Sequence, residues 1–316
     1  MTFKVSVVIP AYNVERFIEK AVLSVFKLEE VREVVVVNDG STDGTLEILN
    51  DLKNKYPNRL KVLHHLNQAN RGRSASRNLG IKKTTSDFIA FLDADDNYLP
   101  NRFEKDKYNF ENHEVEVVYN AVGYKFYRKL DNDEKNYFNK LNSVTQPLEN
   151  GNVFESLLSS KYGYLHLNGL TVKKSVFEKV GYFNENLPVA EDSDFIFKLG
   201  LLCEFKAGNI SEAVAVRGIH DKNIYNDDML YEKWNIKLYE SILGWCYGQG
   251  TSKENIDSVL KWLWEIKFRD NKDLFHYIYY WITLSFKFPQ TIFSIFFIKY
   301  FPVVRLRKKL MPSIFR

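Results

Sequence analysis

The stretch Phe88-Ile-Ala-Phe-Leu-Asp-Ala-Asp-Asp96 decides how this chain folds and where its chemistry lies. Five apolar residues suited to a strand end abruptly in three acids within four positions. Because an unpaired buried carboxylate is costly, acids at the end of a buried strand favour a cation. Mg²⁺ and Mn²⁺ take oxygen ligands and leave positions for phosphate oxygens. The stretch therefore predicts a metal-bound diphosphate at a strand end. The alternative is a solvated acidic turn in which Asp95 caps a helix.

Strands and helices alternate through the first hundred residues. Apolar runs typical of strands covered on both faces occupy 5–9, 34–37, 60–63 and 88–92, and Pro10 is expected to end the first. Apolar residues at helical spacing follow the first two runs, and a short helix is expected over 74–81. This repetition implies a parallel sheet with right-handed crossovers. The polar segments that follow the strands should then share one edge of the sheet.

Composition indicates a soluble enzyme with an appendage. The 316 residues suffice for one large α/β domain and a smaller region, and 45% apolar with 27% charged content argues against disorder. A net charge of +4 is too small to indicate a nucleic-acid partner. Two cysteines suggest a reducing compartment, and strand-forming residues from Val5 leave no room for a signal peptide. We therefore expect a cytoplasmic protein.

The segments after the first two strands carry candidate nucleotide contacts. Pro10-Ala-Tyr-Asn13 follows the first strand, where Tyr12 can stack on a base and small Ala11 allows a ligand to approach closely. Asn38-Asp-Gly-Ser41 follows the second, where Asp39 can accept a hydrogen bond from a base N–H. The alternative for this segment is a plain turn.

Three arginines lie between the third and fourth strands, at positions 71, 73 and 77. Arginine suits bidentate phosphate contacts, and one functional arginine is expected more readily than three. The chain has neither a Gly-x-Gly-x-x-Gly loop after the first strand nor a Gly-x-x-x-x-Gly-Lys-Ser/Thr loop. Dinucleotide-binding and P-loop functions therefore lose their main support.

Four motifs together resemble the inverting glycosyltransferases of family 2. They are Val5-Ser-Val-Val-Ile-Pro-Ala-Tyr-Asn13, Val36-Val-Asn-Asp-Gly-Ser-Thr-Asp-Gly-Thr45, Ser74-Ala-Ser-Arg-Asn-Leu-Gly80 and Phe91-Leu-Asp-Ala-Asp-Asp96. The resemblance is strong over the first hundred residues and weaker to about His220. It implies a GT-A fold, an α/β class with a Rossmann-like, mostly parallel sheet flanked by helices, here with a helical C-terminal appendage. It also implies a nucleoside-diphosphate sugar donor and a divalent cation, Mn²⁺ or Mg²⁺.

The resemblance also implies roles for single residues. Asp39 would contact the base, Asp93 would approach the ribose, and Asp95 would hold the metal. The donor site would comprise Pro10, Ala11, Tyr12, Asn13, Asp39, Ser41, Arg71, Arg77, Asp93 and Ala94. His220 would be a further metal ligand or a diphosphate contact, the alternative being a structural histidine. His166 falls where the family places acceptor contacts, whereas His64 and His65 are expected to be structural.

Glu191-Asp192 follows a segment, Gly181-Tyr-Phe-Asn-Glu-Asn-Leu187, that is similar to the family's Gly-Gly-Phe-Asp-Glu stretch. In such enzymes the acid at the following helix start is the general base. An acceptor hydroxyl has a high pKa and must lose its proton as the new bond forms. Asp192 is the expected base, ahead of Glu191 and Asp194. The alternative is that these acids only favour a helix N-terminus.

The composition divides the chain into a catalytic domain over 1–228 and a helical region over 229–316. Within the first, 1–100 would bind the nucleotide sugar and 101–228 would form the acceptor side. The stretch 274–301 is aromatic and aliphatic, but Lys287 and Pro289 leave two halves too short to span a bilayer. With the basic segment Arg305-Leu-Arg-Lys-Lys309, it suits an interfacial helix pair on an anionic membrane, which would place the protein on the inner face of the cell membrane. A packed hairpin or a homodimer interface is the alternative.

The expected function is sugar transfer from a nucleotide sugar, with UDP expected from family frequency, to a hydroxyl of a saccharide or lipid-linked acceptor. Surface polysaccharide or glycoconjugate biosynthesis is the expected setting. A catalytically silent nucleotide- or carbohydrate-binding scaffold is the alternative, and the presence of all four acids (Asp39, Asp93, Asp95 and Asp192) favours the enzyme. A nucleotidyltransferase would need a glycine-rich basic loop at 10–13, which this chain lacks.

Overall fold

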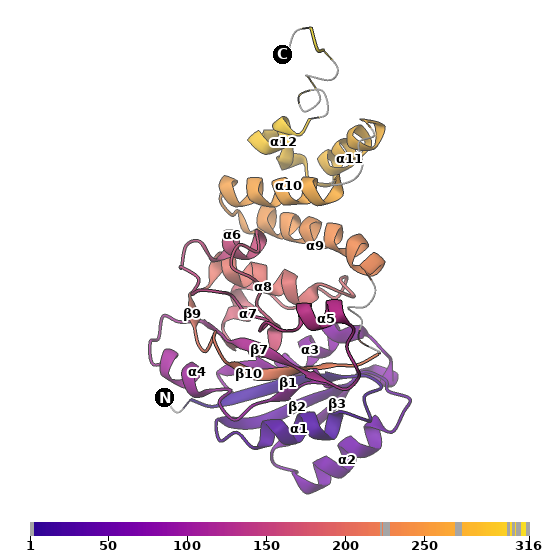
Figure 1. Cartoon of the computed structure of the whole chain (residues 1–316), viewed down its shortest axis with the longest axis vertical. Helices are drawn as coiled ribbons and strands as arrows, with labels where there is room; N and C mark the ends of the chain where they lie inside the picture. Colours follow the sequence, from indigo (N-terminus) through magenta and orange to yellow (C-terminus); the bar gives the residue numbers. More distant parts are fainter. Residues whose placement is uncertain are drawn as a thin grey trace. The chain divides into compact units, whose positions relative to one another are not determined.

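The computed structural model describes residues 3–221, 223, 228–268, 274–301, 304, 307 and 311–313, without the side chains of 228–233. The chain divides into two compact units, Met1–Asn226 and Asp227–Arg316 (Figure 1).

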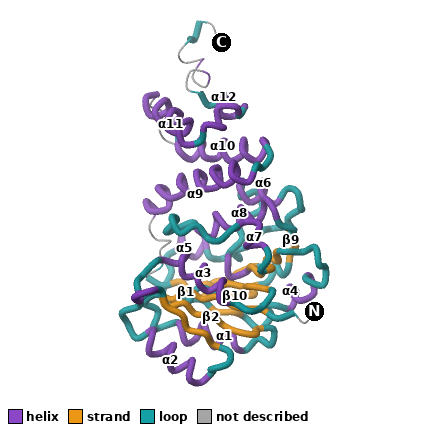
Figure 2. The backbone as a smooth tube through the Cα atoms, turned by 180° about the vertical axis from the view of Figure 1, so that it is seen from behind, coloured by secondary structure: helices purple, strands orange, loops and turns teal. Residues whose placement is uncertain are grey.

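A seven-stranded sheet forms the centre of the first unit, in the order β3-β2-β1-β4-β8-β6-β9. These strands are β1 (Val5–Ala11), β2 (Val31–Asn38), β3 (Leu60–His64), β4 (Phe88–Phe91), β6 (Val117–Tyr119), β8 (Leu170–Lys173) and β9 (Phe205–Ala207). Strands β1 to β4 are parallel, whereas β8 runs antiparallel to β4 and β6. The predicted mostly parallel α/β class is confirmed (Figure 2).

Helices cover both faces of this sheet, which explains the continuous apolar runs. On one face α1 (Ile18–Phe26) and α2 (Thr45–Lys55) share a core with the alternate residues Val7 and Ile9 of β1. The helix α3 (Gly72–Lys83) lies on the other face. Its Gly80 is so close to β1 that a Cβ at this position would be 2.5 Å from Val8 Cγ1. The missing side chain thus lets α3 pack closely on β1.

The first strand continues through Pro10, contrary to the expectation that this proline ends it. Pro10 pairs with Val37 of β2, but the pairing of β1 with β4 ends at Val8. Proline has no backbone N–H to donate, and it is tolerated in a strand where no neighbouring strand needs that hydrogen bond. The extra length carries Tyr12 and Asn13 beyond the end of the strand.

A second sheet of three strands, in the order β5-β10-β7, stands beside the first. It consists of β5 (Asn97–Tyr98), β7 (Ala121–Phe126) and β10 (Ala213–Ile219). Among the described residues, this unit also contains η1 (Leu66–Gln68), α4 (Glu104–Asn109), α5 (Asn132–Tyr137), α6 (Val153–Leu158), η2 (Leu167–Gly169), α7 (Val176–Val180) and α8 (Glu191–Leu202). Strand β10, near the end of this unit, pairs with β5 and therefore lies beside the acidic turn that precedes β5.

The second unit is helical. It contains α9 (Asp228–Gln249), α10 (Lys253–Lys267), α11 (Leu274–Lys287), the short helix η4 (Pro289–Phe293) and α12 (Ile295–Lys299). The predicted apolar stripe of α10 is buried throughout, as are Leu238 and Ile242 of α9, whereas the side chain of Tyr231 lies outside the described residues. Among the described residues, no helix combines the length and apolar character that crossing a bilayer requires.

Candidate active site

The acidic turn after β4 contains carboxylates in two kinds of environment. The side chains of Asp93 and Asp95 are 28% and 25% exposed, whereas Asp96 is buried. Asp96 accepts hydrogen bonds from the backbone N–H of Gly218, at 2.7 Å, and from the side-chain amide of Asn168. Burial, with the nearby charges of Asp95 and Asp93, raises the pKa of Asp96. Asp96 therefore holds the turn in place, and the other two acids face solvent.

The two residues predicted as metal ligands lie together. The Nε2 atom of His220 is 2.9 Å from Oδ2 of Asp95, and the side-chain amide of Asn223 donates to the same oxygen at 3.4 Å. The ring of Phe17 stacks on His220 with 4.8 Å between centroids. A partly exposed carboxylate and imidazole of this kind offer an oxygen and a nitrogen donor that suit a divalent cation.

A second group of donors consists of Asp93, Asp96 and His166, whose ligand atoms lie within 4.8 Å of one another. Asn168 connects all three: its Oδ1 accepts from Asp93 N at 3.1 Å, its N–H donates to His166 Nδ1 at 3.2 Å, and its amide bonds Asp96. Both Asp96 oxygens and His166 Nδ1 have hydrogen-bond partners, and Asp95 Oδ2 and His220 Nε2 are bonded to each other, so both groups of donors are candidates for holding a cation. The sequence interpretation missed Asn168, which lies in a region noted only for acceptor contacts.

Arg77 is a buried bridge between carboxylates. It is 2% exposed, and its Nη2 and Nη1 atoms donate at 2.7 Å to Asp93 Oδ1 and Glu191 Oε1. Burial would lower the pKa of the guanidinium, but the charges of Asp93 and Glu191 raise it overall. Burial would raise the pKa of Asp93, but the charges of Arg77, His166 and Arg73 and the hydrogen bond from Arg77 together outweigh burial and lower the pKa to about 2. Arg71, the other arginine predicted to contact the donor, is exposed, and donor contact by either arginine stays a prediction.

Asp39 lies at the end of β2 and is 3% exposed. Its carboxylate oxygens accept from the backbone N–H groups of Arg71, at 2.7 Å, and Gly72, at 2.8 Å. Gly72 has a φ of 86°, a conformation that glycine adopts most readily. Asp39 therefore fixes the start of α3. His65, expected to be structural, places Nε2 3.4 Å from Asp39 Oδ1.

The loops after β1 and β2 are tied to each other. Asn13 N–H donates to Ser41 Oγ at 3.0 Å, and the Asn13 side-chain oxygen accepts from Thr42 N at 2.8 Å. Tyr12 is 49% exposed beside them. The remaining predicted donor residues, Pro10, Ala11 and Ala94, are buried. An exposed aromatic ring on a fixed loop is able to stack on a planar ligand.

The first turn of α8 contains three acids in different settings. Glu191 is buried against Arg77 and Arg73, and burial raises its pKa although both arginines act in the opposite direction. Asp194 is buried and pairs with Lys198 at 2.5 Å. Asp192 is partly exposed, and its Oδ1 accepts from Ser193 N at 2.8 Å. Of the three, Asp192 is the acid that a ligand can reach.

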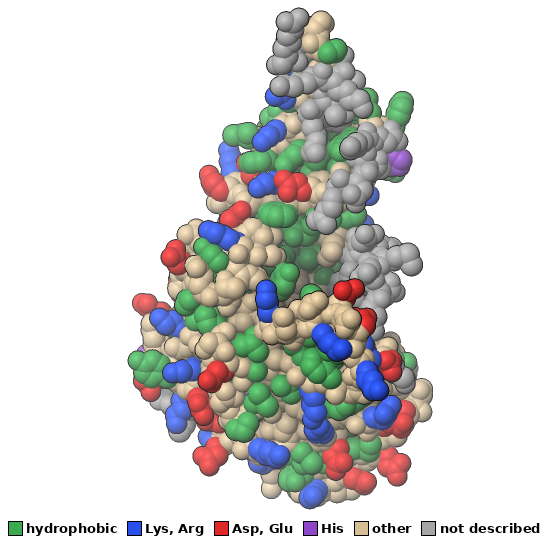
Figure 3. Space-filling model, in the orientation of Figure 1, with side chains coloured by type: hydrophobic (Ala, Val, Ile, Leu, Met, Phe, Trp, Pro, Cys, Tyr) green, Lys and Arg blue, Asp and Glu red, His purple; other side chains and the backbone are tan. Residues whose placement is uncertain are grey.

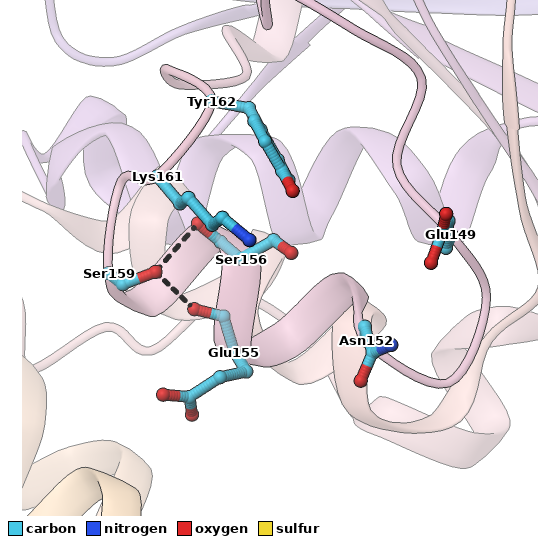
Figure 4. Close-up of a pocket in the computed structure, with 7 residues that line it drawn as sticks. All are labelled: Glu149, Asn152, Glu155, Ser156, Ser159, Lys161 and Tyr162. Carbon is cyan, nitrogen blue, oxygen red and sulfur yellow. Dashed lines mark hydrogen bonds between the residues drawn. The ribbon is translucent and has the colours of Figure 1, made fainter.

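A polar hollow of about 260 Å³ lies beside α6 (Figure 4). It is lined by Glu149, Asn152, Glu155, Ser156, Ser159, Lys161 and Tyr162. The Ser159 hydroxyl donates to the backbone oxygens of Glu155 and Ser156. None of the predicted site residues lines this hollow, so it is separate from the acidic turn.

Residues 6–161 match the model of the family described as glycosyl transferase family 2. The match covers 156 of the 316 residues. The family 2 resemblance predicted from the motifs is thereby supported.

The chain is also similar to whole proteins that contain such domains. It is 29% identical over 251 residues to the minor teichoic acid biosynthesis protein GgaA of Bacillus subtilis (strain 168), covering 77% of this chain and 52% of that protein. It is 31% identical over 202 residues to the uncharacterized glycosyltransferase EpsJ of the same organism, covering 60% and 54%. The chain thus spans about half the length of these relatives.

Two solved structures share the fold. The structure of S. aureus TarS 1-349 with UDP-GlcNAc has a TM-score of 0.62 and 20% identity, covering 84% of this chain and 73% of that chain. The mannosyltransferase PcManGT from Pyrobaculum calidifontis, with GDP-Man and Mn²⁺, has a TM-score of 0.55 and 16% identity, covering 98% and 88%. At these identities the likeness shows the fold of the chain.

Proposed function

We propose that this chain is a metal-dependent inverting glycosyltransferase, which transfers a sugar from a nucleoside-diphosphate sugar to a hydroxyl group of a saccharide or lipid-linked acceptor. The observation that carries this proposal is the meeting of Asp95 and His220 at 2.9 Å, although 125 residues separate them in the chain. Together with the family 2 match over residues 6–161, which includes Asp95 but not His220, this pair supports a cation site at the strand end where a diphosphate would bind.

UDP is the proposed nucleotide, and a surface polymer or its precursor is the proposed acceptor. The fold is like that of TarS, which was solved with UDP-GlcNAc, and the sequence is similar to GgaA, which is named for teichoic acid biosynthesis. The similarity to GgaA supports surface polysaccharide or glycoconjugate biosynthesis as the setting.

The residues at the acidic turn fit a divalent cation. Asp95 offers a hard carboxylate oxygen, His220 offers an imidazole nitrogen, and the 25% and 15% exposure of their side chains leaves room for diphosphate oxygens. Asp95 and His220 would hold Mn²⁺ or Mg²⁺. When bound, the cation offsets the negative charge that develops on the leaving diphosphate.

The donor would lie along the edge where the strands end. Tyr12 would stack on the base. The backbone N–H groups of Arg71 and Gly72 occupy one lone pair on each carboxylate oxygen of Asp39. Asp39 would use a remaining lone pair to accept a hydrogen bond from a base N–H. Asp93 is held through Oδ1 by Arg77, and its low pKa keeps it ionised at neutral pH. Its Oδ2 atom would accept hydrogen bonds from the ribose hydroxyls.

Asp192 would act as the general base. An acceptor hydroxyl must lose its proton as it attacks the anomeric carbon, and a carboxylate within hydrogen-bond reach can take that proton. The neighbouring acids, Glu191 and Asp194, are paired with arginine and lysine, which leaves Asp192 for this role. A single displacement inverts the anomeric configuration.

The second unit is proposed to dock on an anionic membrane surface that carries a lipid-linked acceptor. On α11 the buried side chains are Tyr277, Tyr280 and Leu284. The opposite face exposes a stripe at helical spacing, Phe275, Ile278, Tyr279, Ile282 and Phe286. Hydrophobic side chains lie on the surface of this unit (Figure 3). An exposed apolar area of this kind commonly marks an interaction site.

Charge supports a membrane as the occupant of this stripe. No acidic residue follows Asp273 in the sequence, and Lys299 is exposed on α12, whereas the exposed Lys287 of α11 pairs with Glu240 at 2.7 Å. Most of the basic segment 305–309 lies outside the described residues. Aromatic residues flanked by cations favour the headgroup region of anionic lipid. A homodimer interface on the same stripe is the competing occupant.

A donor screen tests the proposed function. The purified chain is incubated with UDP-, GDP- and dTDP-sugars, with Mn²⁺ or with excess chelator, and nucleotide release is measured. We expect release from one or a few UDP-sugars, abolished by the chelator. Tight nucleotide binding without release from any donor, in the presence of acceptor saccharides, would identify a silent scaffold instead. Full turnover in the chelator would remove the metal from the proposal.

A further inference from the structure

One helix, α3, holds the chain that leads into α8. Arg73 donates to Pro188 O at 3.1 Å, Asn78 donates to Phe183 O at 2.9 Å, and Arg77 donates to Glu191 at 2.7 Å. The start of α3 is itself fixed by Asp39 through backbone N–H groups. The position of the first turn of α8 therefore depends on side chains of α3.

The turn before α8 needs such support. Ala190 has φ 62° and ψ 17°, in the left-handed region, which residues with a Cβ enter at an energetic cost. It directly precedes Glu191, which is 2% exposed and bonded to Arg77. A residue in a strained conformation persists where the surrounding structure holds it in place. Ala190 lies directly before Glu191 and two residues before Asp192, the proposed general base.

Arg77 joins the two halves of the proposed reaction. Its Nη2 atom holds Asp93, two residues before the proposed metal ligand Asp95, and its Nη1 atom holds Glu191, one residue before the proposed base Asp192. Sixteen residues separate Arg77 from Asp93 and 114 separate it from Glu191. One planar, buried guanidinium thus connects a donor-side carboxylate to the acceptor-side turn.

We propose that Arg77 is a positioning residue that couples donor binding at Asp93 to the placement of Asp192, with Glu191 as its anionic partner on α8. The inference rests on the proposed function. A donor that engages Asp93 fixes the guanidinium, and the guanidinium fixes Glu191. Asp192, the next residue, is then held where the acceptor hydroxyl must lie.

The geometry requires arginine. A guanidinium presents donors in a rigid fork that reaches two carboxylates at once, whereas a lysine ammonium is a point charge on a flexible stem. In Arg77→Lys the buried positive charge remains, but one ammonium replaces the two arms that reach Asp93 and Glu191. This variant therefore weakens the link while preserving the charge.

Kinetics of matched variants test the coupling. In Arg77→Lys we expect kcat for transfer to fall by about 10²-fold, as misplacement of a catalytic group by about 1 Å can cause. UDP affinity, measured by calorimetry with Mn²⁺, should fall much less than kcat, because Asp93 stays beside the acidic turn while Asp192 loses its support. The control is Lys198→Gln, which breaks the buried pair with Asp194 on the same helix without touching Arg77 or Glu191. It should lower the Tm at least as much as Arg77→Lys and leave kcat unchanged.

Hydrogen exchange gives a readout that needs no turnover. In the wild-type chain, UDP with Mn²⁺ should slow amide exchange both at 93–96 and at 187–194. In Arg77→Lys, protection should remain at 93–96 and be lost at 187–194. Where Arg77→Lys fails to fold, Glu191→Gln tests the same link, because a glutamine side chain still accepts from Arg77 but carries no charge.

The outcomes separate this inference from the proposed function. Equal kcat in the wild type and Arg77→Lys, or nucleotide protection of 187–194 that survives the substitution, overturns the coupling and leaves the glycosyltransferase intact. Absence of nucleotide binding and transfer in the wild type overturns the proposed function, and the coupling with it.

Discussion

Gly218 runs so close to Asp95 that a Cβ at this position would lie 2.5 Å from the Asp95 carbonyl oxygen. The backbone N–H of Gly218 also donates to Asp96 at 2.7 Å. Through these two contacts β10 is pressed against the acidic turn. His220 follows two residues later and reaches Asp95 for that reason.

Gly218→Ala should separate His220 from Asp95, because the added methyl group meets rigid backbone. We expect Mn²⁺-dependent UDP binding to weaken by at least about tenfold, equivalent to about 1.4 kcal/mol. Calorimetry with and without Mn²⁺ measures this. The control is Gly248→Ala in α9, where a Cβ meets nothing within 4 Å and helix propensity adds about 1 kcal/mol of stability. Undiminished Mn²⁺-dependent binding in Gly218→Ala would mean that His220 does not hold the cation.

Asp192→Asn should bind the donor and metal normally but fail in transfer, because an amide cannot take the acceptor proton. Loss of a general base costs about 10²–10⁴ in rate. Steady-state kinetics and calorimetry on the same preparation separate the two effects. Asp194→Asn is the comparison: its main cost should be stability, since Asp194 is buried and paired with Lys198.

A wild-type rate for Asp192→Asn would transfer the role of base to a neighbouring acid. Product stereochemistry is an independent check. Proton NMR of the product should show the anomeric configuration opposite to that of the donor, and retention would contradict a single displacement.

The exposed stripe of α11 should mediate binding to anionic vesicles. Replacing Phe275, Tyr279 and Phe286, which are 80%, 73% and 83% exposed, by serine should reduce co-sedimentation while leaving the Tm unchanged. Tyr108→Ser, at a 70% exposed position of the first unit, is the matched control and should not reduce it. Binding should weaken with salt, because ions screen the basic residues.

A deletion from Leu274 onward should abolish vesicle binding and lower activity on a lipid-linked acceptor, with UDP binding retained. Equal co-sedimentation of the full and shortened chains would contradict a membrane role for this segment. A concentration-dependent dimer of the full chain, lost with the triple serine substitution, would identify the stripe as an interface between copies.

Glu33 should make stability depend on acid pH. Its buried carboxylate pairs with Lys61 at 2.6 Å and accepts from Ser6 and Thr85. Burial acts to raise its pKa, but these partners outweigh burial and lower it. Its contribution is therefore present above the unfolded pKa of about 4.3 and is lost as pH falls through the folded value.

Glu33→Gln should cost about 1–3 kcal/mol of the free energy of unfolding at pH 7, since several buried donors lose a charged acceptor. The difference from the wild type should shrink as the pH falls below 4. Urea titrations at pH 7, 5 and 3 measure it. A constant difference at all three values would show that the Glu33 charge contributes nothing.

Local pattern was sufficient to predict the framework of the first unit. The apolar runs that became β1 to β4 have lengths and flanking turns typical of buried parallel strands, and such signals act over a few residues. The end of β4 was predicted at the three acids for the same reason, because an acid continues a buried run only where it finds partners, as Asp96 does. The length of β1 was missed, since tolerance of Pro10 depends on where the neighbouring β4 ends.

Type and spacing predicted the chemistry of single residues, but only the tertiary structure decided their partners. Arg77 was predicted as a phosphate contact from its residue type, and the fold buries it between two carboxylates. Asn168, which joins Asp93, Asp96 and His166, had no local signal because its bonds reach segments far away in sequence.

The sequence by itself determined the mostly parallel sheet, the strand-end acids and the amphipathic C-terminal helices, because periodicity and turn chemistry are properties of neighbouring residues. Only the tertiary structure decided that His220 meets Asp95, that Arg77 links Asp93 to Glu191, and which acid of α8 remains open. These relationships arise where segments distant in sequence pack together, as β10 packs against the acidic turn. A charged side chain that is buried at such a contact is stabilised by a partner from the other segment.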